Sequence, residues 1–233
     1  MARYEPRGIW QKVLSGLSDR EGWLGKKAQK KLRRAYMARA MESFEAIEKE
    51  LGLHDTCIDL GANYGDYTRR LAETGAVVHA FEPDPQTFEI LKENVGGLSN
   101  VVLHQVAVAQ TSGTMNLYRI QEDLASTAEK RSWGASLVPS QRSSRSDVVE
   151  VEVRSFEQVL AEIGKPVKLV KMDIEGAEVE ILYKILAAPE LYAAENLFVE
   201  THERQRPEQL ADVMRLRSAF GGLSRPDVHL YWP

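Results

Sequence analysis

Residues 56–65 read TCIDLGANYG, and they carry the clearest indication of the fold. Residues 56–60 form a short, largely apolar run that is typical of a buried strand. The glycines at positions 61 and 65 then indicate a tight turn into a helix expected at residues 66–73. This segment therefore predicts a strand, a turn and a helix that together begin an α/β domain.

The same alternation continues on the C-terminal side of this segment. Further strands are expected at residues 77–81, 101–108, 114–118, 148–153, 167–172, 196–201 and 228–232, and further helices at 85–95, 155–163, 177–186 and 207–220. Strands that alternate with helices predict an α/β fold with a doubly wound, mostly parallel sheet. In such sheets, ligands bind beyond the carboxyl ends of the strands.

The N-terminal region has a different pattern. Within residues 26–51 an apolar residue recurs every three or four positions, which predicts an amphipathic helix; these residues are Leu32, Tyr36, Ala40, Phe44, Ile47 and Leu51. Residues 1–40 hold 11 Lys and Arg against 3 Asp and Glu, whereas the remaining 193 residues hold 19 against 31. We therefore expect a basic helical extension at 1–52 and an acidic domain at 53–233. The basic arm could touch an anionic substrate, nucleic acid or a membrane surface, but a solvated face that complements the acidic body or a partner subunit is favoured.

The composition limits the class of protein. The chain has 233 residues, of which 43% are hydrophobic and 27% charged, as in globular proteins. A single cysteine, Cys57, excludes an intrachain disulfide framework and a Cys-cluster metal site. The sequence has no apolar run of about 18 residues and no apolar signal segment at its start. We expect a cytoplasmic protein without a membrane span.

Two segments indicate how a nucleoside ligand would be held. Gly61 and Gly65 allow the backbone to approach a ligand closely, and Asp59 at the strand end can accept hydrogen bonds from an ammonium group. Glu82 ends the next strand, where an acidic residue can bond both hydroxyls of a ribose. A nicotinamide dinucleotide competes for this arrangement, but Asn63 stands where its fingerprint needs a glycine. The pattern therefore favours S-adenosylmethionine, with S-adenosylhomocysteine as product.

Two further segments carry the candidate catalytic side chains. Asp173 and Glu175 follow the strand expected at 167–172, and strand alternation would point them to opposite faces. Glu200 and His202 lie at the end of the strand expected at 196–201 and would share a face. Histidine is the usual proton acceptor near pH 7, so His202 is a candidate base, although a histidine at a strand end is more often structural.

At these four segments the sequence resembles the FkbM family of S-adenosylmethionine-dependent methyltransferases. The most specific pieces are DLGANYGDYT at 59–68, FEPDP at 81–85, KMDIEGAE at 171–178 and FVETH at 198–202. The resemblance implies a class I, Rossmann-like methyltransferase fold with seven strands. It also implies methylation of an oxygen, either a hydroxyl of a sugar or natural product or, in some members, a carboxylate. About 30 residues follow His202, so the terminal hairpin of that sheet is expected to be shortened, completed by another element or missing.

The resemblance also assigns site residues. It implies that the methionine part of the cofactor is held by Asp59, Gly61, Ala62, Asn63 and Gly65. By the same similarity, Glu82 would hold the ribose, Val106 and Ala107 would lie beside the adenine, and Asp173 would line the pocket near the methyl group.

The expected reaction is an in-line attack by the acceptor oxygen on the sulfonium methyl, which positioning should dominate. A hydroxyl acceptor benefits from a base, for which His202 and Asp173 are candidates, whereas a carboxylate acceptor needs none. A metal held by Asp173, Glu200 and His202 is conceivable because all three are ligand types, but none is expected.

Two other functions compete with this one. A nucleic-acid methyltransferase is favoured by the basic arm and opposed by the acidic body and by the absence of an Asn-Pro-Pro-Tyr-type motif. A non-catalytic module that binds a nucleoside is opposed by the intact motifs. The expected partner is a small-molecule or glycan acceptor, with a homodimer possible through residues 26–51. We also expect the segment 121–147 to act as a lid, in which a ring and cations suit a sugar or an anion; these are Arg131, Trp133, Arg142 and Arg145.

Overall fold

The computed structural model describes residues 8–18, 22–119, 135–137, 148–223 and 225–232. Its main sheet has the strand order β10-β9-β8-β1-β2-β3, and every neighbouring pair is parallel. The strands are β1 (Thr56–Leu60), β2 (Val77–Phe81), β3 (Val101–His104), β8 (Val167–Met172), β9 (Ala194–Val199) and β10 (Asp227–His229). The strand order switches direction beside β1, and because these strands are parallel the carboxyl ends of β1, β2 and β8 lie at the same edge of the sheet.

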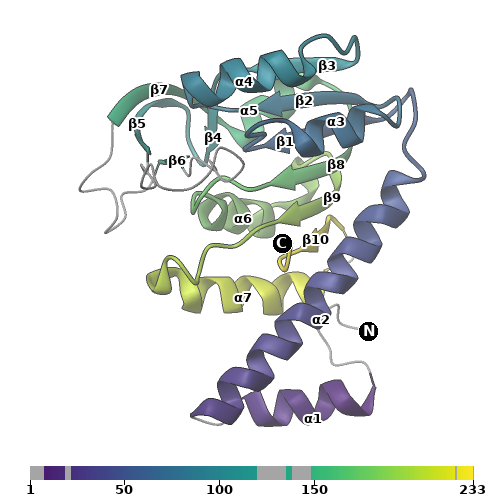
Figure 1. The fold of residues 1–233 in the computed structure, drawn as a ribbon, viewed down its shortest axis with the longest axis vertical. Coiled ribbons are helices and arrows are strands. Elements are labelled where there is room, and N and C mark those ends of the chain that lie inside the picture. Colours follow the sequence, from purple (N-terminus) through teal and green to yellow (C-terminus); the bar gives the residue numbers. More distant parts are fainter. Residues whose placement is uncertain (1–7, 19–21, 120–134, 138–147, 224, 233) are drawn as a thin grey trace.

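Helices cover both faces of this sheet (Figure 1). One face carries α2 (Trp23–Glu48), α3 (Asp66–Ala72) and α4 (Pro85–Val95), and the other carries α5 (Phe156–Ile163), α6 (Glu178–Ala187) and α7 (Leu210–Gly221). Two short 3-10 helices lie at Pro189–Leu191 and Pro207–Gln209. The predicted α/β fold, with a doubly wound, mostly parallel sheet and an N-terminal helical extension, is therefore confirmed.

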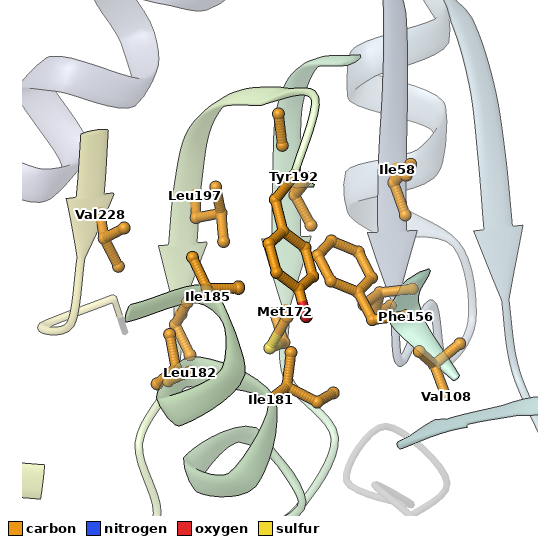
Figure 2. Close-up of a cluster of buried hydrophobic side chains, with 14 of the residues drawn as sticks. Ile58, Val108, Phe156, Met172, Ile181, Leu182, Ile185, Tyr192, Leu197 and Val228 are labelled. Carbon is orange, nitrogen blue, oxygen red and sulfur yellow. The ribbon is translucent and has the colours of Figure 1, made fainter. Parts of the chain in front are cut away.

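Alternating side chains of each strand separate the two cores. Cys57 of β1 packs with Val78 and Leu169 on the α2 and α3 side, whereas Ile58 packs toward α5 and α6. Figure 2 shows the second core, where Phe156, Ile181 and Leu182 lie against the sheet. Because both faces are buried, the strands are almost continuously apolar, and the sequence of β1 already showed this feature.

A second, four-stranded sheet contributes residues to the side of the molecule at which a ligand is expected to bind. Its order is β4 (Ala107–Ala109), β7 (Val148–Ser155), β5 (Gly113–Arg119) and β6 (Ala135–Ser136). The strand predicted at 101–108 is therefore wrong as one element. β2 ends at Phe81, so the chain leaves the main sheet after His104, and β4 pairs with β7 instead.

Two other expectations need correction or extension. The resemblance implied seven strands, but the described residues form six in the main sheet, with β10 parallel to β9 at its edge. Helix α1 (Ile9–Ser18) was not predicted and packs against α2 (Figure 1). None of the helices described is both long and apolar enough to cross a membrane.

Candidate functional site

A cavity of about 610 Å³, open to solvent, lies at the carboxyl ends of β1, β2 and β8. The walls are the turn after β1, the end of β2, strands β4 and β5, and the turn after β8. The lining residues are Leu60, Gly61, Asn63, Phe81, Glu82, Pro83, Val106, Ala107, Val108, Leu117, Leu137, Asp173, Ile174 and Glu175.

The turn after β1 forms the floor of the cavity. Gly61 has φ +74°, and a Cβ built there would lie 1.8 Å from the backbone oxygen of Asp173. No side chain fits at that position, because the turns after β1 and β8 touch. Asn63 also has a left-handed backbone, with φ 50°, and its buried Oδ1 has no hydrogen-bond partner. The floor is thus a close-fitting backbone surface with one buried acceptor that lacks a donor.

Glu82 is fixed beside that turn. Its Oε2 accepts a hydrogen bond from the backbone N–H of Asn63 at 3.0 Å, and its Oε1 accepts one from the N–H of Asp84 at 3.0 Å. Burial raises the pKa of Glu82 to about 7, although these two hydrogen bonds act in the opposite direction. Each carboxylate oxygen keeps acceptor capacity toward the cavity, so a diol could donate to both.

Asp59 lies below the floor and does not line the cavity. It is fully buried, and its Oδ2 accepts a hydrogen bond from the Thr68 hydroxyl at 2.7 Å. Its Oδ1 lies 3.3 Å from Lys171 Nζ, which also donates to the Gly61 carbonyl at 2.7 Å. Burial opposes the charge on Lys171, but the carboxylates of Asp59 and Asp173 outweigh it and raise its pKa. Asp59 and Lys171 together hold the floor in place.

Acidic side chains surround His202 behind the cavity. Its Nε2 lies 3.5 Å from an oxygen of Asp173 and 3.5 Å from one of Glu175, and its Nδ1 lies 2.9 Å from Glu178 Oε1. Burial of the ring opposes a charge, but these carboxylates outweigh it and raise the pKa to about 9. His202 is therefore positively charged near pH 7 and is not available as a proton acceptor.

The remaining acids of this region are also perturbed. Burial raises the pKa of Asp173 and of Glu175, and His202 acts in the opposite direction on both. Burial and the charge of Asp173 raise the pKa of Glu200 to about 7. Strand alternation predicted that Asp173 and Glu175 point to opposite faces, but both line the cavity. The reason is that β8 ends at Met172 and Glu175 has a left-handed backbone, with φ 57°.

The structure brings most, but not all, of the predicted site residues to the cavity. Of the predicted cofactor residues, the cavity is lined by Gly61, Asn63, Glu82, Val106, Ala107 and Asp173. Ala62 packs with Leu91 under α4, and Gly65 starts α3. Of the predicted catalytic residues, Asp173 and Glu175 line the cavity, whereas Glu200 and His202 do not.

Several lining residues were missed by the sequence analysis. Leu117 and Leu137 close the cavity from β5 and from the residue after β6. They are single apolar residues without a motif, and only the pairing of the second sheet brings them here. Leu137 lies in the segment expected as a lid; the four lid residues named for it, 131, 133, 142 and 145, fall outside the described residues.

Comparisons with known proteins agree with this arrangement. A family model described as "Methyltransferase FkbM domain" matches residues 59–221. The 2-O-methyltransferase NoeI of Sinorhizobium fredii (strain NBRC 101917 / NGR234) is 26% identical over an alignment of 137 residues, and the match covers 54% of this chain and 55% of the relative. The match thus spans about half the length of that relative.

Two solved structures are similar to parts of the chain. An rRNA methylase from Streptococcus thermophilus has 12% identity and a TM-score of 0.36, covering 64% of this chain and 63% of that one. Thermoplasma acidophilum 1320 has 22% identity and a TM-score of 0.22, covering 44% of this chain and 51% of that one. The family model, which covers well over half of the 233 residues, is the finding that classifies the sequence. This chain belongs to the FkbM-domain methyltransferase family.

Proposed function

We propose that the protein transfers a methyl group from S-adenosylmethionine to a hydroxyl oxygen of a small acceptor of the carbohydrate class. The family membership supports the reaction, and the relative NoeI, a 2-O-methyltransferase, supports an oxygen as the acceptor atom. The carbohydrate class follows from the acceptors that the family resemblance implies. The observation that carries the proposal is the position of Glu82. It is a buried carboxylate fixed by two backbone N–H groups at the edge of the cavity.

The residues present fit the proposed cofactor. Glu82 would accept hydrogen bonds from the two ribose hydroxyls, and the backbone at Gly61 allows close approach of the methionine part. The unpartnered Oδ1 of Asn63 would accept a hydrogen bond from the amino group. Val106 and Ala107 offer an apolar wall for the adenine. A dinucleotide is disfavoured because Asn63 replaces the glycine that a pyrophosphate requires.

Two acids of the cavity would serve methyl transfer to a hydroxyl. When bound, the cofactor supplies a methyl on a positively charged sulfur, so that the new O–CH3 bond forms as the S–CH3 bond breaks. Asp173 and Glu175 line the cavity, and one of them would take the hydroxyl proton. Alignment of acceptor and methyl by the cavity walls would supply the larger part of the rate, on the order of 7–11 kcal/mol.

The proposal is tested first by binding. Isothermal titration calorimetry should show that the wild type binds S-adenosylhomocysteine and that Glu82→Gln binds it at least about tenfold more weakly, because hydrogen bonds to a charged group contribute about 1.5–3 kcal/mol each. The control Glu93→Gln changes an exposed acid on α4 and should bind as the wild type does. Binding of a nicotinamide dinucleotide instead of the nucleoside would refute the assignment.

The acceptor class is tested by transfer. The protein would be incubated with S-adenosylmethionine labelled in the methyl group and with panels of glycans, polyketides and peptides. We expect label in an O-methyl group of a glycan, located by mass spectrometry. Label that appears only in peptides or in polyketides would contradict the carbohydrate assignment.

A further inference from the structure

Three side chains with metal-binding atoms converge behind the cavity. Asp173 follows β8, Glu178 is the first residue of α6, and His202 follows β9. One ligand atom of each lies within 4.8 Å of the others. Glu178 and His202 are 0% and 3% exposed, whereas Asp173 lines the cavity. The cluster is therefore buried on the side of Glu178 and His202 and accessible from the cavity at Asp173.

A buried oxygen of this cluster lacks a hydrogen-bond partner. Glu178 Oε1 accepts from the backbone N–H of Ile174 at 3.1 Å and lies 2.9 Å from His202 Nδ1, but Glu178 Oε2 is buried without a donor. Buried polar atoms are almost always paired, so this orphaned oxygen indicates a missing partner.

Negative charge is in excess around the same point. Glu175 and Glu200 act electrostatically on Asp173 and His202 in addition to Glu178. Besides His202, Lys171 lies 3.8 Å from Asp173, but it is engaged by Asp59 and by the Gly61 carbonyl. The missing partner of Glu178 Oε2 is thus expected to be positive.

We propose that Asp173, Glu178 and His202 bind a divalent cation of the Mn²⁺ or Zn²⁺ kind. One imidazole and two carboxylates are a donor set that such ions accept, with coordination positions left open. The ion would displace the proton from His202, because a charged imidazole has no lone pair to offer. Because Asp173 lines the cavity, such an ion would be reachable from the cavity. In a part that rests on the proposed function, the cation would bind the acceptor hydroxyl and make its proton easier to remove. The sequence suggested Glu200 as the third metal ligand, whereas in the structure Glu178 lies with Asp173 and His202.

The test measures metal binding and needs no turnover. The full chain, freed of metal, would be titrated with MnCl₂ and separately with ZnCl₂ in a calorimeter. We expect one site per chain for at least one metal, and affinity at least about tenfold weaker in Glu178→Gln. The control Glu180→Gln changes an exposed acid on the same helix and should bind as the wild type does.

A second variant guards against loss of the fold. Asp173→Asn alters the half-exposed ligand and should weaken binding of the same metal by a similar factor while the circular dichroism spectrum stays unchanged. If neither metal binds the wild type, or if both variants bind as tightly as the control, then the cluster is an ion-pair network and the proposal is wrong.

Titration with S-adenosylhomocysteine on the same samples separates this proposal from the function. A chain that binds the nucleoside but no metal would refute the cation site and leave the methyltransferase assignment intact. A chain that binds metal but not the nucleoside would refute the assignment and leave the site.

Discussion

Glu82 shows how burial can set the pH response of a single side chain. A carboxyl group at the end of a parallel strand is recognisable in the sequence, but its ionisation depends on how deeply it lies. Here it is 6% exposed, and burial raises its pKa to about 7 despite the N–H groups of Asn63 and Asp84. Because the ribose hydroxyls would donate to this group, the carboxylate form is the one that binds the nucleoside.

The affinity for S-adenosylhomocysteine should therefore depend on pH. Below pH 7 the free protein holds a proton on Glu82, and binding must release it, so the affinity should fall as the pH falls, approaching about tenfold per unit. Calorimetry at pH 5.5–8 checks this. Glu82→Gln has no proton to release, so its weaker binding should vary less over the same range. A wild-type affinity that is constant from pH 5.5 to 8 would contradict the expectation.

His202 is the residue at which sequence and structure differ most. A histidine near a strand end suggested a proton acceptor, but the structure surrounds its ring with Asp173, Glu175 and Glu178 and raises its pKa to about 9. The sequence motif shows that these acids are close to one another along the chain. It does not show that the left-handed turn at Glu175 brings Asp173 and Glu175 within 3.5 Å of the same nitrogen, Nε2 of His202.

Among the elements, three segments are joined beside the cavity by hydrogen bonds between Arg206, Ser136 and the Glu175 carbonyl, which we call the clasp. Arg206, just before the 3-10 helix at Pro207–Gln209, donates from Nε to the Glu175 carbonyl at 3.2 Å and from Nη2 to the Ser136 hydroxyl at 2.8 Å. Ser136 in β6 donates to the same carbonyl at 2.7 Å. The guanidinium lies against Gly176, where a Cβ would be 2.4 Å from Nε. The clasp fixes the turn after β8 to the second sheet.

Removal of the clasp should cost stability. We expect Arg206→Ala to lower the free energy of unfolding by about 2 kcal/mol, because it deletes charged hydrogen bonds in a buried place. Arg204→Ala, two residues away and exposed, should change it by less than about 0.5 kcal/mol. Urea denaturation followed by circular dichroism measures both. Equal effects of the two substitutions would show that the clasp contributes nothing.

At the scale of the whole molecule, α2 is part of the core of the domain as well as an extension. Its N-terminal half extends with α1 away from the sheet, whereas its C-terminal half lies beside it (Figure 1). Phe44 of α2 is fully buried and packs against Phe198 and Trp232 at ring distances of 5.2 and 4.6 Å. Arg70 of α3 also pairs with Glu48 at the end of α2. The boundary predicted at residue 52 thus separates the N-terminal helices from the first strand along the sequence. In the structure, α2 packs against the domain that follows this boundary.

Phe44→Ala should destabilise the whole domain. The loss of a fully buried ring costs about 3–5 kcal/mol, and the cavity would adjoin β1 and β9 as well as α2. Thermal unfolding should show a lower midpoint for the entire transition, whereas Glu45→Ala, an exposed neighbour, should leave it nearly unchanged. If the arm were an independent unit, the main transition of Phe44→Ala would keep the wild-type midpoint.

The alternation of strands and helices, the parallel sheet, the family and most of the cavity floor could be predicted from the sequence. These features depend on residues that are close in sequence. The apolar run of β1, the glycine at 61 and the acid at 82 each shape the strand or the turn in which they lie. Asn63 and Glu82 were named from the sequence and do meet at the cavity.

The remaining features depend on how the chain packs in three dimensions. It ended β3 at His104 and moved residues 107–109 into a second sheet, because a strand can pair only where its neighbour continues. It brought Leu117 and Leu137 to the cavity and placed Glu178 against His202. Charge states and cavity walls depend on groups that are distant in sequence, and their distances are set by packing and by strand pairing.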